Sequence, residues 1–223
     1  MIVIVPDVLD AANLARLREI IATASFVDGK LTAGARARRV KNNEMVDAGT
    51  PAAEEARRLV MAGLNNSKLF NRVAFPRRAQ PPMINRYNPQ MAYGAHVDNA
   101  LMGKNPALRS DISLTVFISD PGDYDGGELT IEGDFGQHRI KRPAGQAVIY
   151  PSSSLHRVAP VTRGTRIVAV SWIESYVREP AKRQILFDLE RVRAKLNEMA
   201  LDSIEADLAF KVYSNLMRMW AET

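Results

Sequence analysis

The sequence contains no cysteine, and only three of its 223 residues are histidines. Without cysteine there is no disulfide, no thiolate-bound metal and no cysteine nucleophile, so nitrogen and oxygen atoms must hold any metal ion. Long apolar runs are also absent, and no segment reaches the length of a membrane-spanning helix. The apolar residues 1–5 end at Pro6 without a basic leader. We therefore expect no signal peptide, no membrane partner and a cytoplasmic location.

The excess of one charge over the other is small. The chain has 30 Lys and Arg residues against 25 Asp and Glu residues, which gives a formal net charge of +5. A mildly basic balance permits an acidic partner but is commoner on ordinary protein surfaces, so nucleic acid is not an expected partner. The hydrophobic content of 46% and the charged content of 25% are typical of a globular protein of one medium-sized domain.

Helix signals precede the central part of the chain. Asp7 or Asp10 is placed to cap a helix that ends near Thr23. Thr50 followed by Pro51 is a typical helix start, and this second helix is expected to reach about residue 65.

A second helical region follows residue 179. Two apolar stripes at helical spacing predict a helix pair, with a cap at Asp202 or Ser203 between them. The stripes are Ile185, Leu189, Val192, Leu196 and Met199, then Ile204, Leu208, Val212, Leu216 and Trp220. We expect the pair to pack on its own chain, and a homodimer through these helices is the alternative.

The middle of the chain has the pattern of many short strands. Segments rich in β-branched and aromatic residues alternate with glycine, proline and aspartate clusters. The predicted strands are 83–87, 113–119, 128–131, 146–150 and 166–172. Strands of this spacing predict an antiparallel sandwich or barrel, so the fold class is α+β with a mainly β core.

Two connections are expected at the rim of this barrel. Residues 25–47 are irregular and basic, with Arg36, Arg38, Arg39 and Lys41 close together. Composition alone favours a solvated loop, and a flap over the functional site is the other interpretation. We expect residues 30–47 of this loop and the connection 100–109 to shape the choice of substrate.

The candidate metal site is His96-Val97-Asp98 together with His156. Side chains two apart in a strand point to the same side, so His96 and Asp98 can contact one metal ion. A third ligand at His156 would complete two histidines and one carboxylate. This set leaves coordination positions open and is typical of non-haem Fe(II) oxygenases.

The candidate partner of an anionic co-substrate is Arg166. It begins an alternating segment in which Val168, Val170 and Trp172 would share its face. A hairpin turn at residues 162–164 would place this segment beside the strand of His156, on the order of 10 Å away. A short dicarboxylate fits between the metal and a buried arginine, which suggests 2-oxoglutarate. Thr115 or Tyr87 is placed to donate a hydrogen bond nearby.

Several longer motifs resemble the bacterial PKHD-type hydroxylases, which are named for the prolyl/lysyl hydroxylase domain and include the PiuC-like proteins. The similarity covers most of the chain. The motifs are Asp28-Gly29-Lys30, Thr32-Ala33-Gly34, Val40-Lys41-Asn42-Asn43, Tyr87, Tyr93-Gly94-Ala95-His96-Val97-Asp98-Asn99, Arg109-Ser110-Asp111, Asp125-Gly126-Gly127-Glu128-Leu129, Pro151-Ser152-Ser153-Ser154-Leu155-His156-Arg157-Val158 and 166–172.

The resemblance implies a double-stranded β-helix (jelly roll) with its core at about 80–175. Residues 1–178 would then be the Fe(II)/2-oxoglutarate dioxygenase domain, and 179–223 a helical extension. It also implies Fe(II) on His96, Asp98 and His156, 2-oxoglutarate on Arg166, and L-ascorbate as a reductant of over-oxidised iron. The expected reaction is hydroxylation of a C–H bond with O₂, releasing succinate and CO₂. The substrate stays open between a prolyl or lysyl residue, a free amino acid and another small molecule.

Three alternatives use the same residues. An AlkB-like nucleic-acid demethylase would have a second arginine where this chain has Trp172. A non-catalytic jelly-roll sensor would be expected to have lost ligand residues, yet all four candidate positions are intact. A hydrolytic zinc site uses the same ligands but leaves an inward Arg166 unexplained. His138 has no partner at ligand spacing and is interpreted as a strand or surface residue.

Overall fold

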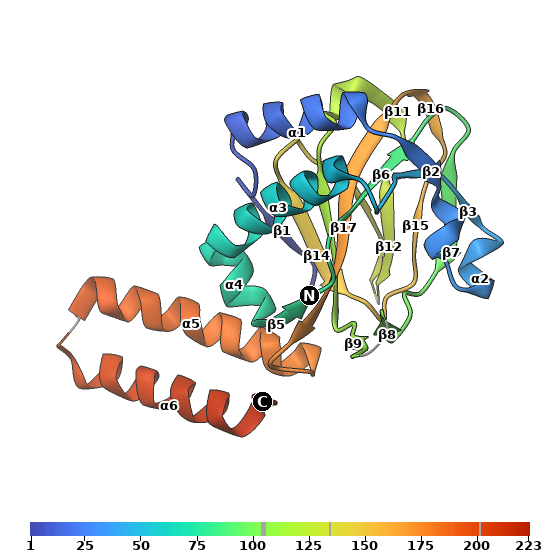
Figure 1. Ribbon diagram of the computed structural model, residues 1–223. Coiled ribbons are helices and arrows are strands. Elements are labelled where there is room, and N and C mark those ends of the chain that lie inside the picture. The colour runs from blue at the N-terminus through green and yellow to red at the C-terminus, as the bar shows by residue number, and fades with distance from the viewer. Residues whose placement is uncertain (104–105, 134, 201) are drawn as a thin grey trace.

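Two antiparallel sheets lie against one another in the computed structural model, which describes residues 1–103, 106–133, 135–200 and 202–223 (Figure 1). The major sheet has eight strands. Its order is β1 (Val3–Val5), β14 (Ala147–Pro151), β10 (Ile112–Phe117), β17 (Arg166–Ser175), β6 (Met83–Tyr87), β4 (Glu44–Val46) and β2 (Phe26–Asp28), and β5 (Pro76–Ala79) also pairs with β17. The minor sheet has five strands, in the order β13 (Gly136–Ile140), β12 (Leu129–Gly133), β15 (His156–Val158), β7 (Ala92–His96) and β3 (Lys41–Asn42).

Two short ladders join the ends of the sheets. They are β11 (Tyr124–Gly126) with β16 (Val161–Gly164), and β8 (Leu101–Met102) with β9 (Leu108–Arg109). One buried cluster contains Phe117 and Val168 from the major sheet and Leu129 and Val158 from the minor sheet, so the two sheets share a core. This is the predicted jelly roll with a mainly β core.

The period of two along β10 and β17 gives each strand two different faces. Leu114 and Val116 of β10 belong to the apolar cluster beneath the helices, whereas Ser113 and Thr115 face the space between the sheets. Because both faces are covered, β10 is buried along its whole length. The same strands therefore build the core on one side and a cavity on the other.

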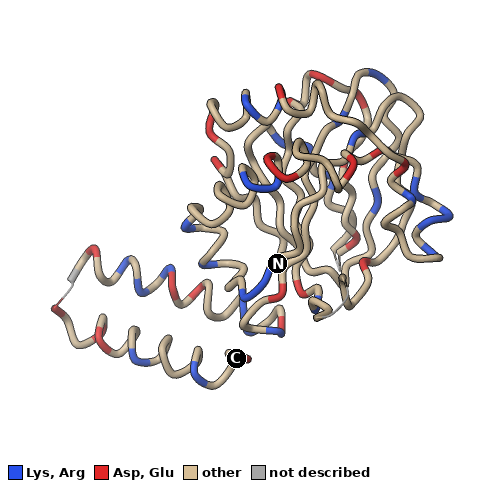
Figure 2. Tube along the Cα trace, in the orientation of Figure 1, with Lys and Arg blue, Asp and Glu red and all other residues tan. Residues whose placement is uncertain are grey.

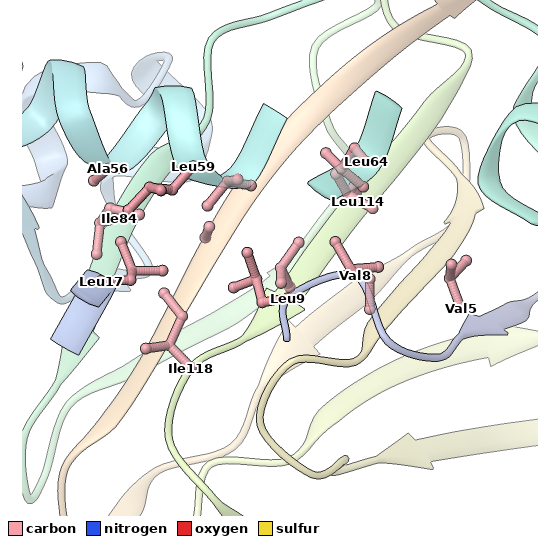
Figure 3. Close-up of a cluster of buried hydrophobic side chains, with 14 of the residues drawn as sticks. Val5, Val8, Leu9, Leu17, Ala56, Leu59, Leu64, Ile84, Leu114 and Ile118 are labelled. Atoms are coloured by element: carbon pink, nitrogen blue, oxygen red, sulfur yellow. The ribbon is translucent and has the colours of Figure 1, made fainter. Parts of the chain in front are cut away.

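Three helices cover the outer face of the major sheet: α1 (Ala11–Thr23), α3 (Pro51–Asn66) and α4 (Lys68–Ala74). Figure 3 shows Leu17 of α1 and Leu64 of α3 among the side chains that form this apolar layer. The predicted caps are present, because Asp10 accepts a hydrogen bond from the backbone N–H of Asn13 and Thr50 from that of Ala53. Asp10, not Asp7, is the first cap.

The C-terminal pair, α5 (Pro180–Ala200) and α6 (Ile204–Trp220), extends away from the sheets (Figure 1). Of the two predicted caps, Asp202 and Ser203, Ser203 is the residue that caps α6. The predicted packing stripe of α5 is wrong in part, because Ile185 and Val192 are 50% and 53% exposed while Leu186 is fully buried. Part of the predicted break, residue 201, lies outside the described residues. No helix among the described residues is long and apolar enough to cross a membrane.

The predicted hairpin between the strands of His156 and Arg166 is wrong. The β16 strand pairs with β11, and β17 pairs with β6 and β10 of the major sheet. The chain thus passes from one ladder into the other sheet at Gly164, whose φ of +70° permits the change of direction. His156 and Arg166 still face the same cavity, but from opposite sheets.

We expect Gly164→Ala to destabilise the fold by on the order of 2–4 kcal/mol, because it combines a left-handed backbone with a clash. A Cβ at this position would lie 1.9 Å from the carbonyl oxygen of Asp123. The matched control is Gly122→Ala, where a Cβ would meet nothing within 4 Å. Urea unfolding of the three proteins measures the difference. Equal free energies for both variants would contradict the strained crossing.

Candidate active site

A single cavity of 340 Å³ between the two sheets brings the predicted site residues together. All six candidates line it: Tyr87, His96, Asp98, Thr115, His156 and Arg166. The third histidine, His138, lies on the exposed strand β13, as expected. The cavity therefore joins residues that are up to 79 positions apart, Tyr87 and Arg166, which are direct neighbours across β6 and β17.

The possible metal ligands form one compact group. His96 ends β7, Asp98 lies two residues further along the chain, and His156 begins β15 opposite His96. One ligand atom from each residue lies within 4.8 Å of the others. The carboxylate of Asp98 is 3.9 Å from Nε2 of His96 and 3.8 Å from Nε2 of His156. One ion can contact all three side chains.

Backbone carbonyl groups orient both imidazoles. Nδ1 of His96 is 2.8 Å from the carbonyl oxygen of Gly94, and Nδ1 of His156 is 3.0 Å from that of Ser154. An Nδ1–H that donates to a carbonyl leaves Nε2 with a lone pair for a metal. Burial, followed by the charge of His156, lowers the pKa of His96 to about 4, so this ring is neutral at pH 7. Neutral imidazole is the form that binds metal.

The third ligand is also held in place. Ser113 on β10 donates a hydrogen bond to Oδ2 of Asp98 and lies 2.8 Å from Ser152 Oγ. On the other side, the ring of Tyr93 stacks on His96 with 3.6 Å between the ring centroids. Tyr93 is thus a wall of the cavity, as expected.

Arg166 is a buried cation without an anion. Its exposure is 1%, and Nε and Nη1 have no hydrogen-bond partner among the described residues. Its guanidinium carbon lies 5.0 Å from the centroid of the Tyr87 ring and 6.0 Å from that of Phe117. Cation–π contacts alone do not replace the hydration of a fully buried guanidinium, so an anionic ligand is required at this point.

Phenol groups surround Arg166. The buried hydroxyl of Tyr124 also lacks a partner among the described residues. A Cβ at Gly127 would lie 3.0 Å from both Arg166 Cδ and Tyr124 Cε2, so these two side chains meet at this glycine. Burial raises the pKa of Tyr87, Tyr124 and Tyr150, which keeps all three phenols protonated and able to donate to an anion.

The mouth of the cavity is formed by the two predicted rim segments. The first contains η1 (Gly29–Thr32) and α2 (Ala35–Arg38), and Thr32, Ala33, Gly34 and Ala37 line the cavity. Met102 and Gly103 line it from the second rim segment. The basic loop is therefore positioned as a flap over the site, while its arginines point to solvent.

Lys41 is the main functional candidate that the sequence did not single out. This residue of β3 lines the cavity and is only 6% exposed. Its ammonium is 3.3 Å from Thr32 Oγ1 and 5.3 Å from the centroid of the Tyr93 ring. Burial lowers its pKa to about 8, and the negative charges of Asp98 and Asp28 oppose this effect. The residue remains largely protonated at pH 7.

Comparison with known proteins identifies the family. Residues 82–174 match the model of the 2OG-Fe(II) oxygenase superfamily. The chain is 46% identical over 223 residues to a PKHD-type hydroxylase of Synechococcus sp. (strain JA-2-3B'a(2-13)), with 100% of both chains covered. The chain belongs to the PKHD-type hydroxylases. It is therefore an Fe(II)- and 2-oxoglutarate-dependent oxygenase, and the resemblance seen in the sequence is confirmed.

Other relatives agree with this assignment. The chain is 43% identical over 220 residues to PKHD-type hydroxylase YbiX of Escherichia coli (strain 55989 / EAEC), with 98% of both chains covered. Its fold is similar to that of a prolyl hydroxylase from Trichoplax adhaerens, solved with a hypoxia inducible factor peptide fragment. The TM-score is 0.59, the identity 14%, and the match covers 77% of this chain and 82% of that one.

Some functional candidates of this PKHD-type hydroxylase were identified from the sequence, and others were missed. Ser113, Tyr124, Tyr150 and Lys41 were not singled out, although Lys41 and the serine-rich segment before His156 stood in the quoted motifs. A lysine inside a run of basic residues gives no sign that it alone turns inward. The period of two along β10 was the available signal for Ser113, two residues before Thr115.

We expect Lys41→Met to stabilise the metal-free protein at pH 7 by about 1–3 kcal/mol, because it removes a buried ammonium. The pKa of Lys41 is lower in the folded chain, about 8, than its ordinary value of 10.5. Its cost to stability is therefore complete below pH 8 and disappears as the pH rises toward 10.5. Urea unfolding across this range measures the gain, which should shrink over the same interval. The exposed Lys211→Met serves as control, and an equal gain there would contradict the argument.

Proposed function

We propose that His96, Asp98 and His156 hold Fe(II), and that Arg166 receives the far carboxylate of 2-oxoglutarate with help from Tyr87 and Thr115. The enzyme then hydroxylates a C–H bond of a small substrate and releases succinate and CO₂. The observation that carries this proposal is the pairing, in one cavity, of a three-ligand group with a buried guanidinium that has no anionic partner among the described residues.

The donor set fits Fe(II). Two neutral imidazoles and one carboxylate are ligands for a borderline divalent ion, and three protein ligands leave positions for other molecules. His96 and His156 donate Nδ1–H to the carbonyl oxygens of Gly94 and Ser154, and Asp98 accepts from the hydroxyl of Ser113. These hydrogen bonds fix the three side chains before an ion arrives. A set of this kind needs little rearrangement on binding.

The inner end of the cavity fits a carboxylate. Arg166 lines it, and its Nε and Nη1 have no hydrogen-bond partner among the described residues. Tyr87 lies directly opposite Arg166 in the register of β6 and β17, and Thr115 lines the same space with 4% exposure. Charge-assisted bonds from a planar guanidinium are directional, so Arg166 would fix both the position and the orientation of the bound 2-oxo acid.

Bound Fe(II) together with 2-oxoglutarate supplies the activation of O₂, with electrons taken from the oxidative decarboxylation of the 2-oxo acid. The chain supplies the surroundings. Asp98 and the two imidazoles hold the ion, Arg166 orients the co-substrate, and the rings of Tyr93 and Tyr150 limit the access of water to His96 and His156. A dry site protects reactive species from side reactions.

Several further expectations stay predictions. They are the use of L-ascorbate, the cytoplasmic location, the homodimer through α5 and α6, and the division into residues 1–178 and 179–223. A prolyl or lysyl target is likewise suggested only by the family name. The rim segments 30–47 and 100–109 remain the proposed determinants of substrate choice, supported by their place at the cavity mouth.

The test of the co-substrate site is an anaerobic titration of the Fe(II) protein with 2-oxoglutarate, followed by visible absorption. We expect a weak metal-to-ligand charge-transfer band that needs both additions. Arg166→Met should raise the 2-oxoglutarate concentration needed by about 100-fold, the effect of losing a buried charge-assisted pair. Arg163→Met, at an exposed position of β16, is the matched control. Iron binding without any band would contradict the co-substrate assignment.

The test of the metal site uses Asp98→Ala. We expect its affinity for Mn(II), measured from the loss of the free-ion EPR signal, to fall by about 100-fold or more. Asp188→Ala, on the exposed side of α5, is the control with the same substitution. Retention of the wild-type affinity in Asp98→Ala would show that the ion binds elsewhere.

A further inference from the structure

The outer part of the cavity holds a second cation that the proposed reaction does not use. The Lys41 ammonium has three donors, yet its one hydrogen bond among the described residues is the 3.3 Å contact with Thr32. No carboxylate of the described residues lies within salt-bridge distance of it, although Lys41 is only 6% exposed. Buried ammonium groups are normally paired, so this position requires an external acceptor.

Lys41 belongs to a different wall from Arg166. It lies directly across from Tyr93 in the pair of β3 and β7, and Tyr93 stacks on the metal ligand His96. Arg166 projects from β17 of the opposite sheet. The cavity therefore offers one cation on each sheet, and a 2-oxo acid bound to Arg166 and the metal leaves Lys41 available.

The charges in the cavity indicate what Lys41 receives. Among the described residues that line it, Lys41, Asp98 and Arg166 are the ones that carry a formal charge when both histidines bind a metal as neutral imidazoles. Fe(II) would add two positive charges, and the 2-oxoglutarate dianion would remove two. One positive charge is then left, and one further negative charge balances it. Asp98, whose negative charge opposes the effect of burial on Lys41 more than that of Asp28 does, would be engaged by the metal at that stage.

A second donor faces the same space. Trp172 lines the cavity, and its indole Nε1 is buried and has no hydrogen-bond partner among the described residues. The flap adds a long-range contribution, because residues 30–41 contain Lys30, Arg36, Arg38 and Arg39 and no acidic residue. Figure 2 shows this basic run in and beside α2, and Ala33, Gly34 and Ala37 of the same segment line the cavity. Such a field steers anions toward the opening.

We propose that the substrate carries a carboxylate and that Lys41 binds it, with Trp172 as an additional donor. This rests on the proposed function and names its substrate class. One buried ammonium matches the single charge of a carboxylate better than a phosphate monoester, which carries nearly two. The 340 Å³ cavity also has to contain the co-substrate, so the substrate is small. The C-terminal residue of a peptide meets this requirement for one negative charge, because its α-nitrogen is an uncharged amide. A free amino acid offers the same α-carboxylate but also an α-ammonium, which leaves the net charge of the cavity unchanged, so it is the second candidate. A lysyl ammonium beside Lys41 is disfavoured for the same reason.

The experiment measures binding to the anaerobic Fe(II)–2-oxoglutarate enzyme by tryptophan fluorescence. Trp220→Phe leaves Trp172 as the sole tryptophan, since the chain has two. The probes are free L-amino acids, the matching carboxamides, and glycyl dipeptides that end in the same residues. We expect at least one acid to bind about tenfold or more tightly than its carboxamide. The dipeptide arm distinguishes a free amino acid from a peptide C-terminus.

Lys41→Met should abolish this preference for acids, Lys41→Arg should retain part of it, and the exposed Lys211→Met should leave it unchanged. The charge-transfer band should give the same 2-oxoglutarate affinity in all three variants. The proposal is overturned if carboxamides bind as tightly as acids. It is equally overturned if Lys41→Met retains the preference for acids, or if it lowers the affinity for 2-oxoglutarate instead. It is also overturned if no acid alters the Trp172 emission up to about 10 mM, a very weak affinity.

Failure of the proposed function gives a different result. A wild-type protein that binds iron but forms no charge-transfer band contradicts the 2-oxoglutarate site and, with it, this inference. A normal band without any preference for acids contradicts the substrate class alone.

Discussion

The burial of Arg166 is the constraint on which the rest of the structure depends. A guanidinium with 1% exposure between two sheets is tolerated only where an anion can join it. Two features of the surroundings hold the side chain in this position. The strand that carries it, β17, lies at the centre of the major sheet, and Gly127 leaves space for Arg166 and Tyr124 to come together. Both the shape of the cavity and the buried charge of Arg166 therefore indicate a ligand-binding site.

The helices on the outer face stabilise this arrangement. Strands that place Ser113, Thr115 and Arg166 in the cavity carry Leu114, Val116 and Ala169 on the opposite face, beneath α1, α3 and α4. Burial of that apolar layer, at about 25 cal/mol per Å² of apolar surface, offsets the cost of polar groups that await ligands. The alternation along two strands therefore connects the stability of the fold with the chemistry of the site.

The sequence predicts this protein well where a local pattern determines the outcome. The strand 83–87, the caps at Asp10 and Thr50 and the ligand spacing of His96 and Asp98 depend on neighbours in the chain, and all are found. Pairing between strands is not local, so Arg166 was assigned to the wrong partner strand. It still faces the cavity, because the period of two fixes its side of the strand whichever partner β17 has.

Inward and outward positions on irregular or solvent-facing segments are harder to predict. On α5 the apolar stripe and the buried face differ, because the buried face also contains Arg183, which donates to the carbonyl oxygens of Val177 and Arg178. The inward position of Lys41 was not predicted for a related reason. Its neighbours in the basic run are exposed, and only the pairing of β3 with β7 turns this one lysine toward the cavity.

Lys41 and Arg166 together suggest why the site keeps two cations that destabilise the ligand-free protein. Each ligand that binds only the folded chain raises the free energy of unfolding, by an amount that grows with the logarithm of the ratio of its concentration to its dissociation constant. Arg166 lies at the closed inner end and Lys41 near the flap, so the proposed ligands neutralise the cavity from the inside outward. The second neutralisation occurs beside Tyr93, whose ring stacks on the proposed metal ligand His96. A cation at Lys41 thus makes the electrostatics around the metal depend on whether a substrate is present.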